Sequence, residues 1–129
     1  MRQKYFIKAT LKNGVAGYDK KTEYHIGLNK HPNPDSESVK PCGIGIHLAR
    51  NITRAMAYAH DAEEFYLATA GRILGKDESK VRTDECQILC LIPQRIIDEH
   101  KGRQRLTDDE YETKLKLIED EYKADNQVL

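Results

Sequence analysis

The chain of 129 residues is long enough for one domain and too short for two comfortable ones. Charged residues make up 33% of it, 21 Lys and Arg balance 21 Asp and Glu, and no apolar run approaches the roughly 18 residues that span a bilayer. This excludes a membrane-spanning chain. No apolar signal core follows Met1, so we expect a cytoplasmic protein.

Three cysteines, Cys42, Cys86 and Cys90, are an odd number without a secretory signal, which indicates free thiols in a reducing compartment. Cys86 and Cys90 lie four residues apart in an apolar run. On a regular strand they point to the same face, so we expect both to act as small buried hydrophobic residues there. There is no closely spaced cysteine pair, and we expect no metal.

The first third of the chain reads as strands and turns. Residues 5–11 are rich in β-forming side chains and predict a strand. Asn13 and Gly14 tolerate positive φ and predict a hairpin turn, with residues 15–18 as its second arm. Residues 22–28 predict a weaker strand. Residues 29–41 (NKHPNPDSESVKP) form a loop that is too rich in proline for a regular element. A loop of this length is either functional or disordered.

The middle of the chain predicts strands around one short helix. Residues 43–49 read as a buried strand, and Asn51 is a good helix N-cap. Apolar residues recur after it at helical spacing and predict an amphipathic helix of about two turns. The remaining predicted elements are a strand at 64–74, a short strand at 81–82, the most apolar strand at 85–92 and a short helix at 94–100.

The C-terminal end predicts a separate charged helix. Residues 101–106 form a basic linker, and Thr107–Glu110 is a capping box. We therefore expect a compact α+β domain over residues 1–100, with a small mixed or antiparallel sheet and one short central helix. We expect residues 101–129 to be a linker and an amphipathic helix that docks on this domain, on a partner, or on a second copy in a homodimer. The apolar stripe of that helix is Tyr111, Leu115, Ile118 and Tyr122.

Four segments follow one another in an order that resembles a known family. They are Tyr24–Gly27 (YHIG), Gly45–Tyr58 (GIHLARNITRAMAY), Phe65–Gly75 (FYLATAGRILG) and Asp84–Pro93 (DECQILCLIP). Together they resemble the central block of ADP-ribosyltransferases, the group that includes poly(ADP-ribose) polymerases and the related RNA 2′-phosphotransferases. The resemblance covers roughly residues 22–97. It implies a split sheet, NAD as the cofactor and a host macromolecule as the acceptor.

The resemblance gives each matching position a role. His25 would orient the ribose of NAD, and His47 would take the second place of the catalytic triad. Tyr58 would stack on the nicotinamide, because an aromatic face suits a cationic ring. Glu85 would stabilise the positive charge that develops as nicotinamide leaves. The other candidate cofactor contacts are Gly45, Thr53 and Arg54.

A second resemblance keeps a non-catalytic function open. The segments at 41–47 (PCGIGIH) and 80–83 (KVRT) are similar to small uncharacterised domains that are common in phage genomes. The alternative is therefore a phage-type protein that binds or inhibits a host protein through the C-terminal helix or the proline-rich loop. Contact with single-stranded nucleic acid is the least favoured hypothesis, because aromatic and basic residues alternate too sparsely.

Overall fold

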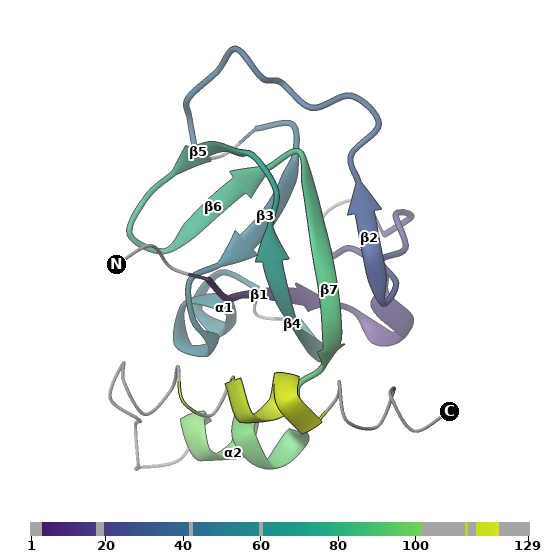
Figure 1. Ribbon diagram of the computed structural model, residues 1–129, viewed down its shortest axis with the longest axis vertical. Helices are drawn as coiled ribbons and strands as arrows, with labels where there is room; N and C mark the ends of the chain where they lie inside the picture. The colour runs from purple at the N-terminus through teal and green to yellow at the C-terminus, as the bar shows by residue number, and fades with distance from the viewer. Residues whose placement is uncertain are drawn as a thin grey trace.

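The computed structural model describes residues 4–17, 20–41, 43–59, 61–101, 113 and 116–121. Seven strands and two α-helices lie in this part of the chain, and residues 116–121 are also helical (Figure 1). The strands are β1 (Phe6–Thr10), β2 (Gly27–Lys30), β3 (Ile46–Ala49), β4 (Glu64–Ala70), β5 (Ile73–Lys76), β6 (Lys80–Thr83) and β7 (Glu85–Leu91). The helices are α1 (Ile52–Tyr58), α2 (Gln94–Lys101) and the short 3-10 helix η1 (Lys12–Gly14).

The strands form one sheet in the order β2-β7-β4-β1-β3-β6-β5, and all paired neighbours are antiparallel. This confirms the prediction of an α+β chain with an antiparallel sheet and few helices. The helix predicted after Asn51 is also confirmed. The side-chain oxygen of Asn51 accepts a hydrogen bond from the Arg54 backbone N–H at 2.8 Å, which satisfies one of the free donors of the first helical turn.

The chain from 64 to 91 is a single long hairpin that bends in the middle. Only Gly71 and Arg72 separate β4 from β5, and only Asp84 separates β6 from β7. β4 pairs with β7 and β5 with β6, yet β6 and β7 stand far apart in the strand order, so the sheet must curl. The prediction of one continuous strand at 64–74 was therefore wrong. It breaks where a side chain at position 71 would collide with Glu85.

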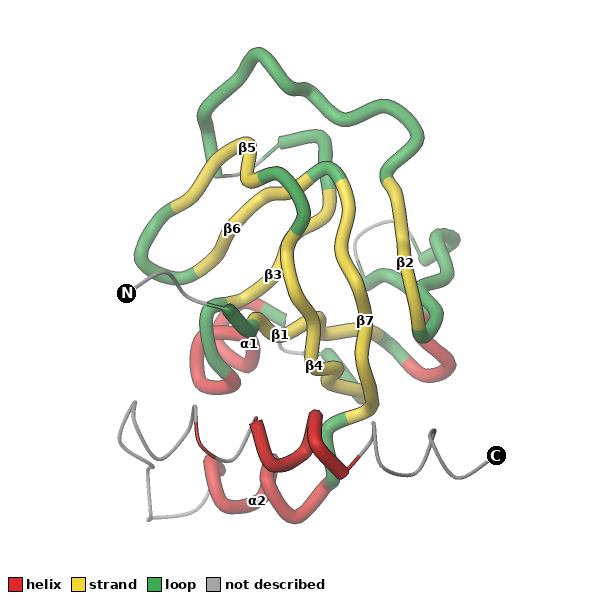
Figure 2. The backbone as a smooth tube through the Cα atoms, in the orientation of Figure 1, coloured by secondary structure: helices red, strands yellow, loops and turns green. Residues whose placement is uncertain are grey.

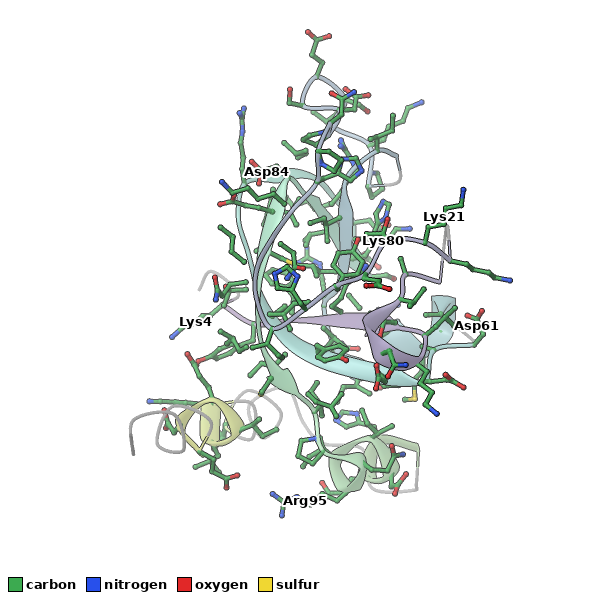
Figure 3. All side chains as sticks on the ribbon, turned by 90° about the vertical axis from the view of Figure 1, so that its right-hand side faces the viewer. Lys4, Lys21, Asp61, Lys80, Asp84 and Arg95 are labelled. Atoms are coloured by element: carbon green, nitrogen blue, oxygen red, sulfur yellow. The ribbon has the colours of Figure 1, made fainter. Side chains whose placement is uncertain are left out.

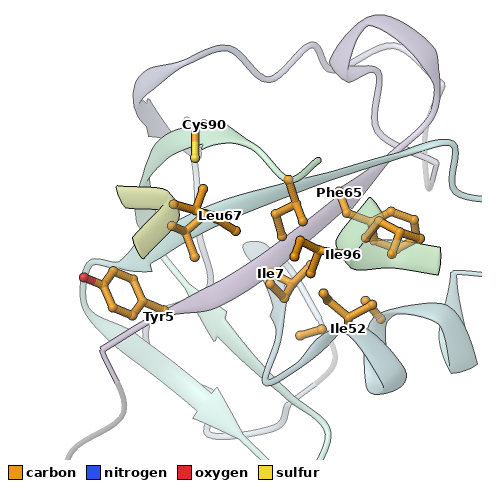
Figure 4. Close-up of a cluster of buried hydrophobic side chains, with 12 residues drawn as sticks. Tyr5, Ile7, Ile52, Phe65, Leu67, Cys90 and Ile96 are labelled. Carbon is orange, nitrogen blue, oxygen red and sulfur yellow. The ribbon is translucent and has the colours of Figure 1, made fainter. Parts of the chain in front are cut away.

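Each face of the sheet has its own hydrophobic core. α1, α2 and the helical residues 116–121 cover one face, where Ile7, Leu67 and Ile96 lie among the buried side chains (Figure 4). The opposite face holds a second cluster drawn from five strands. Alternation along each strand divides the residues between the two faces. The second cluster consists of Phe6, Ile46, Leu48, Ala68, Val81, Cys86 and Ile88.

The expectation that Cys86 and Cys90 share a face was wrong. Cys86 belongs to the second cluster and Cys90 to the cluster under the helices. The strand register shifts between them, because Leu67 pairs with Cys90 while Ala68 pairs with Ile88. One extra residue on β7 reverses the alternation. Burial raises the pKa of each thiol to about 11, so both remain protonated at neutral pH.

The predicted hairpin after β1 was also wrong. Asn13 and Gly14 do take positive φ values of 63° and 75°, and they reverse the chain as expected. However, β1 pairs with β3 and β4, and Val15 forms only an isolated bridge with Glu23. Long-range burial of β1 on both sides therefore outweighs the local turn signal.

Among the described helices, none has the length and apolar character needed to cross a bilayer.

Candidate functional site

The three residues predicted to be catalytic do not contact one another. Glu85 opens β7 and lies 3.9 Å from the Lys30 ammonium on the neighbouring strand β2, with 38% of its side chain exposed. His25 is exposed just before the other end of β2. His47 lies within β3 and is half-buried. No hydrogen bond or ion pair joins any two of these three side chains.

His47 lies in an environment that keeps it neutral. Burial, then Lys8, Lys80 and Arg82, lower the pKa of His47 from 6.5 to about 4. Its Nε2 atom is buried and has no hydrogen-bond partner among the described residues. Its backbone carbonyl accepts a hydrogen bond from Lys8 Nζ at 3.1 Å. The side chain is therefore an unprotonated imidazole surrounded by cations, with one ring nitrogen unsatisfied.

The residues predicted to contact the cofactor do not gather at one described place either. Thr53 and Arg54 are exposed on α1, and Arg54 Nη1 lies 3.4 Å from Ser79 Oγ. Gly45 precedes β3 and packs on Arg82, where an added Cβ would come within 2.8 Å of the Arg82 Cγ. Tyr58 ends α1, and its side chain lies outside the described part of the chain. The predicted NAD contacts therefore do not line one described cavity.

The most organised feature of the molecule is built on Arg82, in the middle of β6. Its side chain is fully buried. The guanidinium donates to four backbone carbonyls, at 3.0 Å to Lys40, 2.7 Å to Asp35, 2.8 Å to Ile44 and 2.6 Å to Ser38. A planar group with five donors suits several acceptors at once. All four carbonyls belong to the segment between β2 and β3.

This segment, residues 35–44, is named here the Arg82 loop. It closes on itself, because the Asp35 N–H donates to the Ile44 carbonyl at 3.1 Å. The Asp35 carboxylate accepts from the backbone N–H groups of Glu37 and Ser38, at 3.1 and 3.2 Å. Asp and Ser favour such local bonds in turns. The proline-rich stretch is thus a defined structure, and it arches over the sheet between β2 and β3 (Figure 2).

A glycine of β5 lets the Arg82 loop approach the sheet. A Cβ added to Gly75 would collide with the carbonyl oxygen of Lys40 and come within 2.8 Å of that of Val39. These are backbone atoms, which cannot move aside cheaply as a flexible side chain does. Position 75 therefore requires glycine for the loop to rest on β5.

The outer side of the Arg82 loop exposes apolar groups. Val39 is 82% exposed and Ile44 is 57% exposed. Glu37 and Lys40 are exposed beside them. The loop stands at one end of the molecule, above Asp84 in Figure 3, and α2 lies at the other end. Two exposed aliphatic side chains on a fixed loop form a candidate contact surface.

The sequence contained only a weak signal for this arrangement. Arginine is seldom fully buried, so the short strand predicted at 81–82 carries no sign that the Arg82 side chain is buried. The carbonyl acceptors have no side-chain signature at all. Within the described residues, no group of three or more His, Cys, Asp or Glu side chains is arranged to hold a metal ion.

Comparison of the chain with protein-family models, curated proteins and solved structures finds no match.

Proposed function

We propose that the protein is a non-catalytic interaction protein and that the Arg82 loop is its recognition surface. The observation that carries this proposal is the buried Arg82 guanidinium, whose four bonds fix a loop that leaves Val39 82% exposed. A loop already fixed in the free protein loses little conformational entropy on binding, which favours affinity. Loops on a rigid scaffold commonly carry recognition.

The exposed groups define the kind of partner. Val39 and Ile44 are aliphatic and β-branched, so an apolar pocket on another protein is the complementary surface. Glu37 and Lys40 supply polar groups for the rim of such a contact. The similarity of segments 41–47 and 80–83 to phage-associated domains supports a host protein as that partner.

Capture from a bacterial cytoplasmic extract tests the proposal. We expect the tagged wild-type protein to retain a specific partner and Val39→Asp to lose it, because a carboxylate cannot enter an apolar pocket without a large desolvation cost. Leu117→Asp is the matched control, since Leu117 is a similarly exposed aliphatic residue, at 55%, on the C-terminal helix. Equal capture by the wild-type protein and Val39→Asp would contradict the role of the loop.

An ADP-ribosyltransferase-like protein with a split sheet that binds NAD is the second candidate. The favouring observation is the neutral His47 imidazole, whose buried Nε2 lacks a hydrogen-bond partner among the described residues; a ribose hydroxyl would satisfy it once the side chains that cover this atom move aside. In this proposal His47→Ala weakens NAD binding. Glu85→Gln retains NAD binding but stops transfer of ADP-ribose to an acceptor. A titration in which NAD does not bind the wild-type protein excludes this candidate.

A further inference from the structure

The strand β2 leaves one side of its backbone without a neighbouring strand. It stands at the end of the strand order, and among the described strands it pairs only with β7 (Figure 1). The edge of a sheet presents a row of backbone N–H and C=O groups that another strand can pair with. Leu28, in the middle of β2, also exposes 47% of its surface. We therefore asked which backbone groups this edge offers.

The hydrogen bonds around β7 show which groups of β2 face the open edge. In an antiparallel pair, opposite residues alternate between pairs that exchange both backbone bonds and pairs that exchange neither. The His31 N–H donates to the Asp84 carbonyl at 2.9 Å, one step beyond the pair of Lys30 with Glu85. Lys30 and, two residues earlier, Leu28 therefore direct their N–H and C=O groups away from β7.

The other neighbour of β7 gives the same result. The Glu85 carbonyl accepts from the Gly71 N–H at 2.8 Å, so this carbonyl points toward the end of β4 and not toward Lys30. Within the described part of the chain, no hydrogen bond reaches the backbone of Leu28 or Lys30 from the open side. Each of these two residues thus keeps one backbone donor and one backbone acceptor for a further strand.

The lysine of this edge has its charge directed toward its own sheet. Charged side chains, and lysine in particular, commonly protect edge strands from pairing. Lys30 Nζ lies 3.9 Å from the carboxylate of Glu85, which is the residue opposite it on β7. The ammonium is thus drawn toward β7. The aliphatic part of the lysine can then cover an apolar residue of a neighbouring strand.

We propose that β2 pairs antiparallel with β2 of a second copy of the chain, so that the two sheets join into one. The free groups define the register: Leu28 stands opposite Lys30 of the second copy, and a two-fold axis passes beside Asn29. Both such pairs then exchange their backbone bonds. The contact is self-complementary, as a two-fold interface must be. No two lysines stand opposite each other, and Leu28 packs on the aliphatic part of the lysine.

The contact is small, because β2 has four residues. Interfaces of this kind are typical of weak association, so we expect a dimer with a Kd of about 0.1 mM. The dimer uses neither the Arg82 loop nor the C-terminal helix, and it is therefore independent of the proposed recognition surface.

Sedimentation equilibrium of charge variants at Leu28 tests the register. Leu28→Lys places like charges opposite each other in both pairs, and Leu28→Glu places opposite charges there. We expect the Kd of Leu28→Lys to exceed that of Leu28→Glu at least about tenfold. Leu91→Lys is the matched control, because Leu91 is a similarly exposed leucine, at 50%, at the end of β7. Its Kd should equal that of the wild-type protein.

Amide hydrogen exchange tests the backbone bonds themselves. We expect the Leu28 and Lys30 amides to become protected as the concentration of the wild-type protein rises. The Asn29 amide faces β7 and should be protected equally at all concentrations, so it is the internal control.

Three results overturn the proposal. The first is a wild-type protein that stays monomeric at about 1 mM, the result expected if the edge pairs with a strand of another protein instead. The second is an equal Kd for Leu28→Lys and Leu28→Glu. The third is a dimer in which the Leu28 and Lys30 amides stay unprotected and which Leu117→Asp dissociates, because that result assigns the contact to the C-terminal helix.

Discussion

Arg82 is a buried charge without a carboxylate partner in the described part of the chain. Its compensation comes from four carbonyl dipoles, each of which would itself be costly to bury unpaired. The residue and the loop therefore depend on each other: the loop supplies the backbone acceptors, and the guanidinium supplies the donors that they need. A lysine at this position has one charged nitrogen and cannot span the same four acceptors.

His47 makes stability depend on pH. Its pKa is lowered from 6.5 to about 4, first by burial and then by Lys8, Lys80 and Arg82. The unfolded chain therefore takes up a proton more readily than the folded protein. Its contribution to the free energy of unfolding is fully present above pH 6.5 and is lost as the pH falls toward 4.

We expect the wild-type protein to lose this stability at low pH and His47→Gln to keep its own, because glutamine does not titrate. Between pH 7 and pH 4.5, urea unfolding should show a larger fall in stability for the wild-type protein than for the variant. Other acid-sensitive groups affect both proteins equally, so the difference isolates residue 47. Two pH profiles that run parallel over this range would show that His47 is not the group responsible.

At the scale of the elements, the contact between the Arg82 loop and β5 predicts a pair of glycine substitutions with different effects. Gly75→Ala places a methyl group against the Lys40 and Val39 carbonyls, and we expect it to cost about 1–3 kcal/mol. Gly17→Ala is the control, because its Cβ would meet only an Asp61 carboxylate oxygen at 3.8 Å. Hydrogen exchange of residues 35–44 should accelerate in Gly75→Ala alone. Unchanged exchange in that variant means that the loop does not depend on this contact.

The elements show what sequence patterns can and cannot predict. Apolar periodicity and the Asn51 cap predicted α1, and the apolar run at 85–92 predicted β7, because both signals are local. The pairing of β1 with β3 and β4 joins residues that are far apart in sequence, and no local signal encodes it. The ordered conformation of the Arg82 loop could not be predicted, for the same reason. Its acceptors are backbone atoms, so the loop sequence predicts proline-rich irregularity but not the guanidinium that orders it.

At the scale of the whole molecule, the helical residues 116–121 belong to the core. Ile118 is 7% exposed and lies in the cluster beneath the helices, and Glu119 lies 4.0 Å from the Lys4 ammonium near the other end of the chain. The other residues of the predicted stripe, Tyr111, Leu115 and Tyr122, lie outside the described part of the chain.

Two neighbouring substitutions test this packing. We expect Ile118→Ala to lower the free energy of unfolding by about 2–4 kcal/mol, because it leaves a cavity in the core. Leu117→Ala, at a position that is 55% exposed, should change it by less than about 0.5 kcal/mol. Thermal or urea unfolding measures both. Equal, small effects would mean that the helix dissociates from the domain in solution.

The bent hairpin of residues 64–91 has a consequence for the order of folding. Its four strands are consecutive in the chain and pair with one another, so they can zip together from the 77–79 turn with short loop closures. β1 must instead find β3 across some forty residues, as the Ile7–Ala49 pair shows. We expect the transition state to contain the hairpin already, with the N-terminal strand joining last. Shortening the side chain of Val81 to alanine should therefore slow refolding, while shortening that of Ile7 to alanine should mainly hasten unfolding.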